Sequence, residues 1–318
     1  MSISVPALNF DKLKPNRMHC IIGKRGDGSN EFLHQLVHNL QVKSDAFVIG
    51  ILDDLTSNHY FAYMYKFCHI ITPFSNLEHV ISEQKSNPEK EIIIIFGDYI
   101  TCQKGVLNSE VIRDLCFNGR NHKITTIFKL QYAMELRCHV RSQLDYVYAF
   151  GDTNRSNCKR LWEYFFGMHE FNQFLKIFRE LTTEPNVCLI HDMTINSKTP
   201  IYYFYKVDIN VCPLIDKYEH PMYYKIICAS YHRILKTLAK YKKILNFENA
   251  DNYGEIKILE DVLTESFKTI QDNSDNKEKM QQELKKMNIF YKQLSMEMDT
   301  WIESVTASLK QFPHGQTP

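Results

Sequence analysis

Residues 21 to 30 read Ile-Ile-Gly-Lys-Arg-Gly-Asp-Gly-Ser-Asn and directly follow a short apolar run. A strand, a glycine-rich turn and then a helix is the order typical of a phosphate-binding loop. In the pattern G-x-x-x-x-G-K-S/T, Gly23 and Gly28 fall on the two glycines, but Ser29 and Asn30 stand where Lys and Ser or Thr belong. Because that lysine reaches the outer phosphates and that hydroxyl holds Mg²⁺, the loop keeps the shape of such a site and lacks two of its chemical groups.

The bulk properties of the chain exclude several classes of protein. Its 318 residues suit one large domain with an appendage, or two domains, and a net charge of +1 gives no overall attraction to nucleic acid or membranes. The 9 cysteines form no C-x-x-C pair and no metal-ligand spacing, which predicts reduced thiols in a cytosolic-type compartment and no metal site. The apolar runs are far shorter than the about 20 residues of a membrane span, so no membrane partner is expected.

Strand and helix patterns alternate between residues 17 and 210. This alternation predicts an α/β domain, a P-loop NTPase-like and mostly parallel sheet flanked by helices, after an irregular N-terminal lead-in at 1 to 16. The expected strands are 18–22, 46–52, 91–96, 124–130, 145–150, 186–191 and 201–207. The expected helices are 31–40, 77–84, 106–116 and 160–178, the last being one helix or two.

Residues 211 to 318 have a different pattern, which predicts an all-helical, coiled-coil-like extension. Its last part carries apolar residues in alternating steps of four and three over about three and a half heptads. These residues are Met280, Leu284, Met287, Tyr291, Leu294, Met298, Trp301 and Val305. Two interpretations stay open: a helical hairpin that folds back on its own chain, which is favoured because neighbouring helices usually pack together, and a coil that binds a partner.

A working nucleotide site also needs a hydrophobic strand that ends in an aspartate for Mg²⁺, often followed by an acidic residue that polarises water. The isoleucine-rich strand Ile92 to Phe96 ends in Gly97 and Asp98. Asp98 falls on the water-polarising position, or on the metal-holding one if the alignment shifts by one residue. In both cases one carboxylate is present where two are wanted.

The third element follows the expected strand 124–130. Gln131 ends that strand and is a candidate γ-phosphate sensor, because ligands of open α/β sheets bind at the carboxyl ends of the strands. Arg141, just before the next strand, is a candidate arginine finger for a neighbouring subunit's nucleotide. Basic side chains in this region form either a DNA-contacting surface or, more commonly, a solvated face. They are Lys123, Lys129, Arg137, Arg141, Arg155, Lys159 and Arg160.

In combination, these motifs resemble the genome-packaging ATPases of poxviruses and other large DNA viruses, a branch of the FtsK–HerA superfamily. The resemblance covers roughly residues 15 to 208. Its segments are 21–26, the isoleucine strand to Asp98, Phe-Asn-Gly-Arg at 117–120 followed by His122, Gln131-Tyr132, Arg141, 145–147, and Leu-Thr-Thr-Glu at 181–184 before 188–190. The resemblance implies a ring-forming, homo-oligomeric ATPase that loads DNA into a capsid, located in the host cytoplasm, a viral factory or the virion. It implies that Gln131 is the sensor and that Arg120 or Arg141 is the trans-acting finger.

The departures from the family pattern decide the functional prediction. Ser29 and Asn30 replace Lys and Ser or Thr, a single carboxylate replaces two, and Asn121 separates Arg120 from His122. Loss of one preorganised electrostatic donor costs about 3 kcal/mol of transition-state stabilisation, so two or three losses are expected to abolish useful turnover. Rescue by Lys24 is not expected, because that lysine already matches the family at its own position.

The sequence therefore predicts a degenerate packaging-ATPase homologue that acts as a structural or assembly component and binds other virion proteins through residues 211 to 318. The residues of its former cofactor-binding loop are Gly23, Lys24, Gly26, Gly28, Ser29 and Asn30, and Asp98, Gln131 and Arg141 are its vestigial catalytic residues. No bound cofactor is expected. Two alternatives stay open: an active motor that uses ATP and Mg²⁺ to translocate DNA, and a nucleotide-binding regulatory subunit in a ring with an active paralogue.

Overall fold

The computed structural model describes residues 5–52, 64, 67–86, 88–97, 106–132, 134–167, 170–194 and 201–210, with six further helical positions at 261, 264, 265, 268, 269 and 286. The chain divides into two compact units, Met1–His220 and Pro221–Pro318. The coiled-coil pattern of the extension and the carboxylate of Asp98 lie outside the described residues. In the described part of the chain, no helix is both long and apolar enough to cross a membrane.

An eight-stranded sheet forms the centre of the first unit, with strand order β3-β2-β4-β5-β1-β6-β7-β8. The strands are β1 (Met18–Ile22), β2 (Phe47–Leu52), β3 (Ile70–Pro73), β4 (Ile92–Phe96), β5 (Ile124–Leu130), β6 (Tyr146–Phe150), β7 (Val187–Asp192) and β8 (Ile201–Lys206). The first six strands pair in parallel, whereas β7 and β8 are antiparallel to their neighbours. The predicted mostly parallel α/β sheet is confirmed, with a mixed edge.

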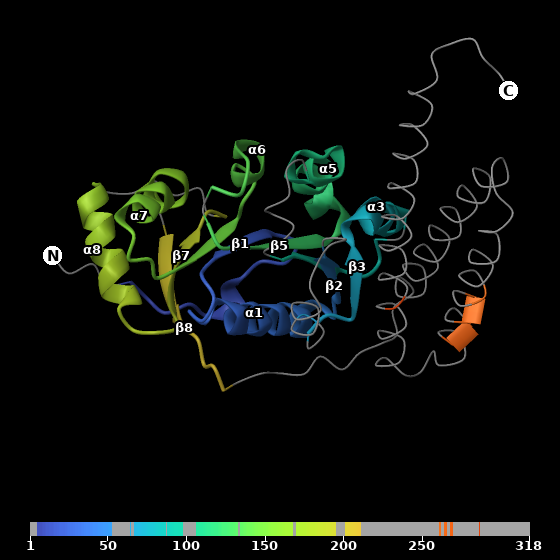
Figure 1. Ribbon diagram of the computed structural model, residues 1–318, viewed down its shortest axis with the longest axis horizontal. Helices are drawn as coiled ribbons and strands as arrows, with labels where there is room; N and C mark the ends of the chain where they lie inside the picture. Colours follow the sequence, from blue (N-terminus) through green and yellow to red (C-terminus); the bar gives the residue numbers. More distant parts are fainter. Residues whose placement is uncertain are drawn as a thin grey trace, which may run out of the picture. The chain divides into compact units, whose positions relative to one another are not determined.

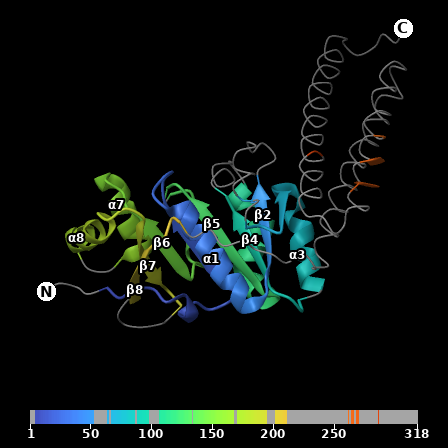
Figure 2. The same cartoon turned by 90° about the horizontal axis from the view of Figure 1, so that it is seen from below.

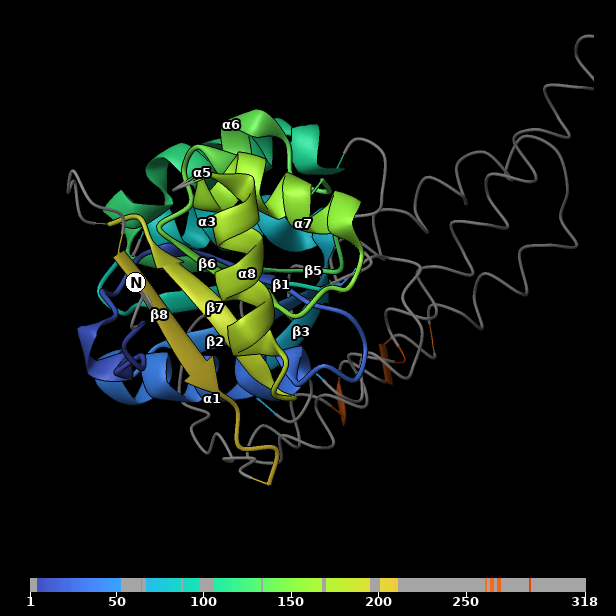
Figure 3. The same cartoon turned by 90° about the vertical axis from the view of Figure 1, so that its left-hand side faces the viewer.

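Helices cover both faces of this sheet (Figures 1 and 3). The helix α1 (Ser29–Ser44) crosses one face beneath β1, β5 and β4, as the view from below shows (Figure 2). Three shorter helices lie on the opposite face: α5 (Glu110–Asn118), α6 (Cys138–Arg141) and α7 (Arg155–Leu161). α3 (Leu77–Ser86) precedes β4, and α8 (Phe171–Thr182) packs on β7. Short helical turns complete the set: Phe10–Lys12, Phe74–Asn76, Val106–Asn108, Gly119–His122 and the π-helical Trp162–Phe166.

The position of β1 determines where a ligand can bind. β1 pairs in parallel with β5 on one side and β6 on the other, with Ile21 opposite Lys129 and Tyr148. Parallel strands present their carboxyl ends at one edge of the sheet, and ligands of such sheets bind at that edge. The glycine-rich loop that follows β1 therefore lies beside the ends of β5 and β6, and β5 separates it from the end of β4.

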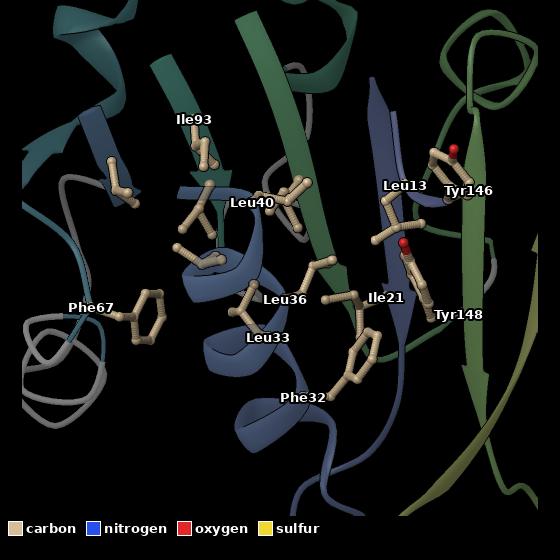
Figure 4. Close-up of a cluster of buried hydrophobic side chains, with 14 of the residues drawn as sticks. Leu13, Ile21, Phe32, Leu33, Leu36, Leu40, Phe67, Ile93, Tyr146 and Tyr148 are labelled. Atoms are coloured by element: carbon tan, nitrogen blue, oxygen red, sulfur yellow. The ribbon is translucent and has the colours of Figure 1, made fainter. Parts of the chain in front are cut away.

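The buried face of α1 is the main support of the loop. Phe32, Leu33, Leu36 and Leu40 recur at helical spacing and point toward the sheet (Figure 4). Phe32 is fully buried, and its ring lies 4.8 Å from that of Tyr148 and 5.6 Å from that of Tyr205. The helix that begins in the loop is thus held by aromatic contacts to β6 and β8.

Three differences from the predicted elements have local causes. The lead-in is irregular as expected, yet it joins the sheet, because the backbone N–H of Leu8 donates to the carbonyl of Phe204 at 2.8 Å and Leu8 is buried. β3 was missed because it is a four-residue edge strand that ends in Pro73, and such strands carry little pattern. The segment 160–178, predicted as one helix or two, is divided at Gly167, which has a positive φ of 30°, and its helices begin earlier, at Arg155, and end later, at Thr182.

His19 is a fully buried histidine in the middle of β1. Its Nδ1 lies 2.9 Å from the Tyr148 hydroxyl, whereas Nε2 has no hydrogen-bond partner among the residues that the structure describes. Burial, with a smaller contribution from the nearby Arg17, lowers the pKa of His19 to about 3. The imidazole is therefore neutral in the folded chain at any pH near neutrality.

We expect Phe32→Ala to lower the free energy of unfolding by about 3–5 kcal/mol, because it removes a fully buried ring from the contact of α1 with the sheet. Urea unfolding followed by circular dichroism measures the change. Val42→Ala is the matched control, since Val42 lies on the same helix with a side chain 71% exposed, and it should change stability by no more than about 0.5 kcal/mol. Equal effects of the two substitutions would contradict the packing described here.

A second prediction concerns His19 and pH. The unfolded chain takes up a proton on His19 near its ordinary pKa of 6.5, and the folded chain does so only near pH 3, so acid favours unfolding between these values. The free energy of unfolding of the wild type, minus that of His19→Gln, should therefore fall by roughly 2 kcal/mol between pH 7.5 and pH 5. A constant difference between wild type and His19→Gln would refute the prediction.

Candidate functional site

The glycine-rich loop is fixed at its base by two hydrogen bonds to β5. The backbone N–H of Gly23 donates to the carbonyl of Leu130 at 3.0 Å, and Nζ of Lys129 donates to the carbonyl of Gly23 at 3.1 Å. The φ angles of Gly26 and Gly28 are 82° and 87°, in the left-handed region that favours glycine. The pattern glycines therefore form the turn that the sequence predicted between strand and helix.

Ser29 and Asn30, the two positions that depart from the pattern, are the first two residues of helix α1. α1 begins at Ser29, two residues before the predicted start, and Asn30 is its second residue. Ser29 is only 1% exposed, and its hydroxyl donates to the carbonyl of Lys24 at 3.4 Å. The hydroxyl is thus used inside the loop, and neither residue supplies the positive charge of the lysine in the pattern.

Asp27 is a loop residue that the sequence analysis did not assign to the site. Its carboxylate accepts the backbone N–H of Lys24 at 2.5 Å and that of Ser29 at 2.9 Å. A Cβ atom built on Gly23 would lie 2.6 Å from Oδ2 of Asp27, which places the carboxylate against the first glycine. Aspartate beside a helix start is a common cap, and this was the available signal in the sequence.

Lys24 is held away from the loop centre. Its Nζ donates to Oδ1 of Asp152 at 2.9 Å, just after β6. Burial raises the pKa of Asp152, but hydrogen bonds from the backbone of Asn154 and from the side chains of Lys24 and Asn157 outweigh it, and the net pKa is lowered. Asp152 is therefore a charged anchor for Lys24.

Lys129 is not part of a DNA-contacting surface, and its inclusion in the basic cluster is corrected. The side chain is 1% exposed and lies beneath the loop, with Nζ on the Gly23 carbonyl. The mistake arose because β5 is buried at all seven of its positions, so its single lysine could not be exposed in the way that charge counting assumes.

Of the predicted sensor and acidic positions, the structure describes Gln131 and Gly97. Gln131 directly follows β5, next to Leu130, whose carbonyl accepts the N–H of Gly23. The side chain of Gln131 is partly exposed. Gly97 is buried at the end of β4, and Asp98 is outside the described residues. The structure therefore brings Gln131 to the loop and leaves the role of Asp98 a prediction.

Arg120 lies at the other end of the sheet. Its Nη2 is 2.7 and 3.0 Å from the two carboxylate oxygens of Asp145. Asp145 also accepts the backbone N–H of Met18 at 2.9 Å. Since Met18 begins β1 and the loop follows the end of β1, this ion pair sits at the amino edge, opposite the loop. A role of Arg120 in its own chain's site is excluded by this topology, and a role in trans stays a prediction.

Arg141 is likewise held within its own chain. Its Nη1 donates to the carbonyl of Leu136 at 2.8 Å, and the guanidinium lies 4.2 Å from the centre of the Tyr164 ring. Both contacts would have to be released before this side chain could reach a nucleotide on another subunit. Its assignment as a finger remains a prediction.

A cavity of about 510 Å³ adjoins the outer side of the loop. Its walls come from the loop, from the turn after β6 and from the connection between α8 and β7: Gly26, Asp27, Gly151, Asp152, Thr153, Arg179, Thr182, Thr183, Glu184, Pro185, Asn186 and Val187. The ionic side chains are largely paired, Asp152 with Lys24 and Glu184 with Lys206. The cavity is thus large enough for a small organic molecule and close to neutral.

The described residues fit Mg²⁺ and a triphosphate poorly. Two loop N–H groups already donate to Asp27, and the ammonium of Lys24 is bound to Asp152. Among the residues that the structure describes, no group of three or more His, Cys, Asp or Glu side chains could hold a metal ion.

Sequence comparison finds relatives in large DNA viruses. Protein 088R of invertebrate iridescent virus 3 is 25% identical over 253 residues, which cover 72% of this chain and 92% of that protein. Protein 075L of invertebrate iridescent virus 6 is 24% identical over 212 residues, covering 63% and 80%. Protein L437 of Acanthamoeba polyphaga mimivirus is 21% identical over 185 residues, covering 54% and 65%. No protein-family model matches the chain.

Comparison with solved structures gives weaker similarities. The DNA-packaging ATPase B204 of Sulfolobus turreted icosahedral virus has a TM-score of 0.45 and 16% identity, covering 60% of this chain and 98% of B204. The pCW3 conjugation coupling protein TcpA has a TM-score of 0.45 and 10% identity, covering 62% of each chain.

The anchoring of Lys24 yields a stability prediction. Asp152→Ala removes the acceptor of three hydrogen bonds and should lower the free energy of unfolding by about 1–3 kcal/mol, as for other partly buried groups that bond to charged partners. Lys24→Ala removes only the half-exposed cation, so its effect should stay below about 1 kcal/mol. Urea unfolding of the two variants gives the order. A larger loss in Lys24→Ala would mean that the ion pair itself stabilises this corner.

Proposed function

We propose that the chain is a packaging-ATPase-like protein of a large DNA virus that has lost hydrolysis and serves as a structural or assembly component. The coarse part of this proposal rests on the α/β sheet with a glycine-rich loop at its carboxyl edge, and on relatives in two iridescent viruses and a mimivirus. The single observation that carries the finer part is the charge arrangement of the loop.

In an active loop of this pattern, a lysine brings positive charge to the outer phosphates while transition-state charge develops on them. Here Ser29 occupies that position and turns its hydroxyl to the Lys24 carbonyl. The nearest loop lysine is bound to Asp152, and the lysine beneath the loop is bonded to Gly23. A negative side chain, Asp27, takes the loop amides instead. This arrangement opposes the binding and cleavage of a polyphosphate.

On this proposal the fold is retained as a scaffold, with the partner bound through residues 211 to 318. The protein would act in the virion or in the infected cell, where assembly takes place, either alone or as a homo-oligomer. We expect contact with DNA only under the alternative in which the chain is an active motor.

The second candidate is a regulatory subunit that binds nucleotide without hydrolysing it. The cavity of about 510 Å³ beside the loop supports ligand binding, because it has the size of a small-molecule site. The loop lacks the lysine that a hydrolysing site of this pattern uses, which favours binding without hydrolysis over an active motor. Such a subunit would complete a ring with an active paralogue.

Phosphate release by the purified full chain, supplied with Mg-ATP with and without double-stranded DNA, tests the proposal. We expect no release above that of the variants Gln131→Ala and Arg141→Ala, because the groups that stabilise the transferred phosphoryl are missing. These variants identify any contaminating ATPase, which would be the same in all three samples.

DNA-stimulated release that disappears in either variant would overturn the proposal in favour of an active motor. Binding of a labelled, non-hydrolysable ATP analogue without release of phosphate would favour the regulatory subunit. Deletion of residues 255 to 318, with loss of the assembly partner in a pull-down from infected cells, examines the scaffold role.

A further inference from the structure

We infer that the Asp27 carboxylate occupies the part of the loop that holds a phosphate group in loops of this pattern, so that the chain closes its own anion cradle. The inference deepens the proposed function and rests on it, since it gives a physical reason for the loss of nucleotide chemistry beyond the two missing side chains.

The hydrogen bonds are the first step. Glycine-rich loops of this pattern bind phosphate through backbone N–H groups that converge on one point. In this chain the N–H groups of Lys24 and Ser29 converge on the two oxygens of one carboxylate, at 2.5 and 2.9 Å. Ser29 stands where the pattern has its lysine. A phosphate would have to displace the carboxylate to reach these donors.

The steric arrangement agrees with this occupancy. The carboxylate lies against Gly23, where an added Cβ would be 2.6 Å from Oδ2. Gly23 is buried at the base of the loop, and Asp27 is partly exposed, so the side chain enters the loop from the solvent side. The space that the absent side chain of Gly23 leaves free is the space that the carboxylate uses.

Electrostatics favours a negative group at this point. The 16-residue helix α1 begins at Ser29 and presents its positive end to the carboxylate. The buried ammonium of Lys129 lies on the other side of Gly23, bonded to its carbonyl. An intramolecular carboxylate gives up no translational freedom when it binds, whereas free phosphate does. The same carboxylate would repel a phosphate that approached the loop.

The inference separates two parts of the site. Asp27 belongs both to the loop and to the wall of the cavity of about 510 Å³. The closed part is the amide cradle, and the cavity beside it stays open. A ligand without phosphate groups would therefore not compete with Asp27, whereas a polyphosphate would.

Inorganic pyrophosphate is the probe that isolates the cradle. Calorimetric titration at low salt should show no binding, or only weak binding, to the full-length wild type. Asp27→Ala should bind pyrophosphate at least about tenfold more tightly, because two loop N–H groups are released and a charge a few ångströms away is removed. The isosteric Asp27→Asn keeps an acceptor oxygen, and its gain should be smaller, about threefold.

Glu184→Ala is the matched control. Glu184 lines the same cavity, carries the same charge and is half exposed on its pair with Lys206, but it has no contact with the loop amides. Its pyrophosphate affinity should stay within about twofold of the wild type. In Asp27→Ala, the backbone amide signals of Lys24 and Ser29 in nuclear magnetic resonance spectra should shift on titration.

Three results would overturn the inference. The first is an equal gain in pyrophosphate affinity in Asp27→Ala and Glu184→Ala. The second is no gain in affinity in a folded Asp27→Ala, and the third is tight binding of pyrophosphate by the wild type. If Asp27→Ala does not fold, Asp27→Asn decides, and the absence of any gain above Glu184→Ala counts against the inference. The proposed function is judged separately, by phosphate release from ATP, by nucleotide binding and by the effect of deleting residues 255 to 318.

Discussion

The parallel pairing of β1 between β5 and β6 is the constraint on which the rest of the structure depends. It fixes the carboxyl end of β1 beside Leu130, whose carbonyl receives the Gly23 N–H, and beside the turn that carries Asp152. The loop, the position of Gln131 at its edge and the cavity all follow from this one register. A shift of β1 by one residue would turn each of its side chains to the other face, including the buried His19.

The same pairing explains why lysine side chains near the loop form hydrogen bonds within the protein. Ile21 lies opposite Lys129 on β5, so the lysine at this position reaches the loop base and not solvent. The end of β6 lies on the other side of the loop, which allows Asp152 to hold Lys24. Lys24 and Lys129 are thus bonded to the protein's own oxygens, and the N–H groups of Lys24 and Ser29 donate to Asp27. The two ammonium groups and the two N–H groups thus have hydrogen-bond acceptors in the protein without a ligand.

The sequence predicts elements better than it predicts side-chain directions. The bounds of the strands at 18–22 and 124–130 were predicted correctly, because an apolar run bounded by a glycine turn or a polar residue defines a buried strand. The edge of the sheet that bears the loop followed from the same alternation. The antiparallel pairing of β7 with β6 and with β8 did not, since the helices α7 and α8 lie between β6 and β7, and a helical connection of this kind is typical of parallel strands.

The parts of the site that were missed share one physical cause. Lys129 was counted as a surface charge because its partner, Gly23, lies far from it in the sequence. Asp27 was passed over because its hydrogen bonds depend on the dihedral angles of the turn, which the residue types do not fix. The Arg120 ion pair with Asp145 is a similar case: a separation of 25 residues becomes a direct contact only after β5 is inserted beside β1. The sequence shows which residues carry charge, and the topology of the sheet determines which partner each charged side chain contacts.

Loss of catalytic groups from a loop of this kind need not destabilise the fold. A helix with an unpaired N-terminus has N–H groups that need an acceptor, and in a nucleotide-binding protein the phosphate provides it. When the ligand is lost, the chain must supply another acceptor or leave those donors to water. In this chain Asp27 accepts the first N–H of α1, while the aromatic contacts of Phe32 hold the helix on the sheet. The loop conformation is thus stabilised by the protein itself, as the proposed scaffold role requires.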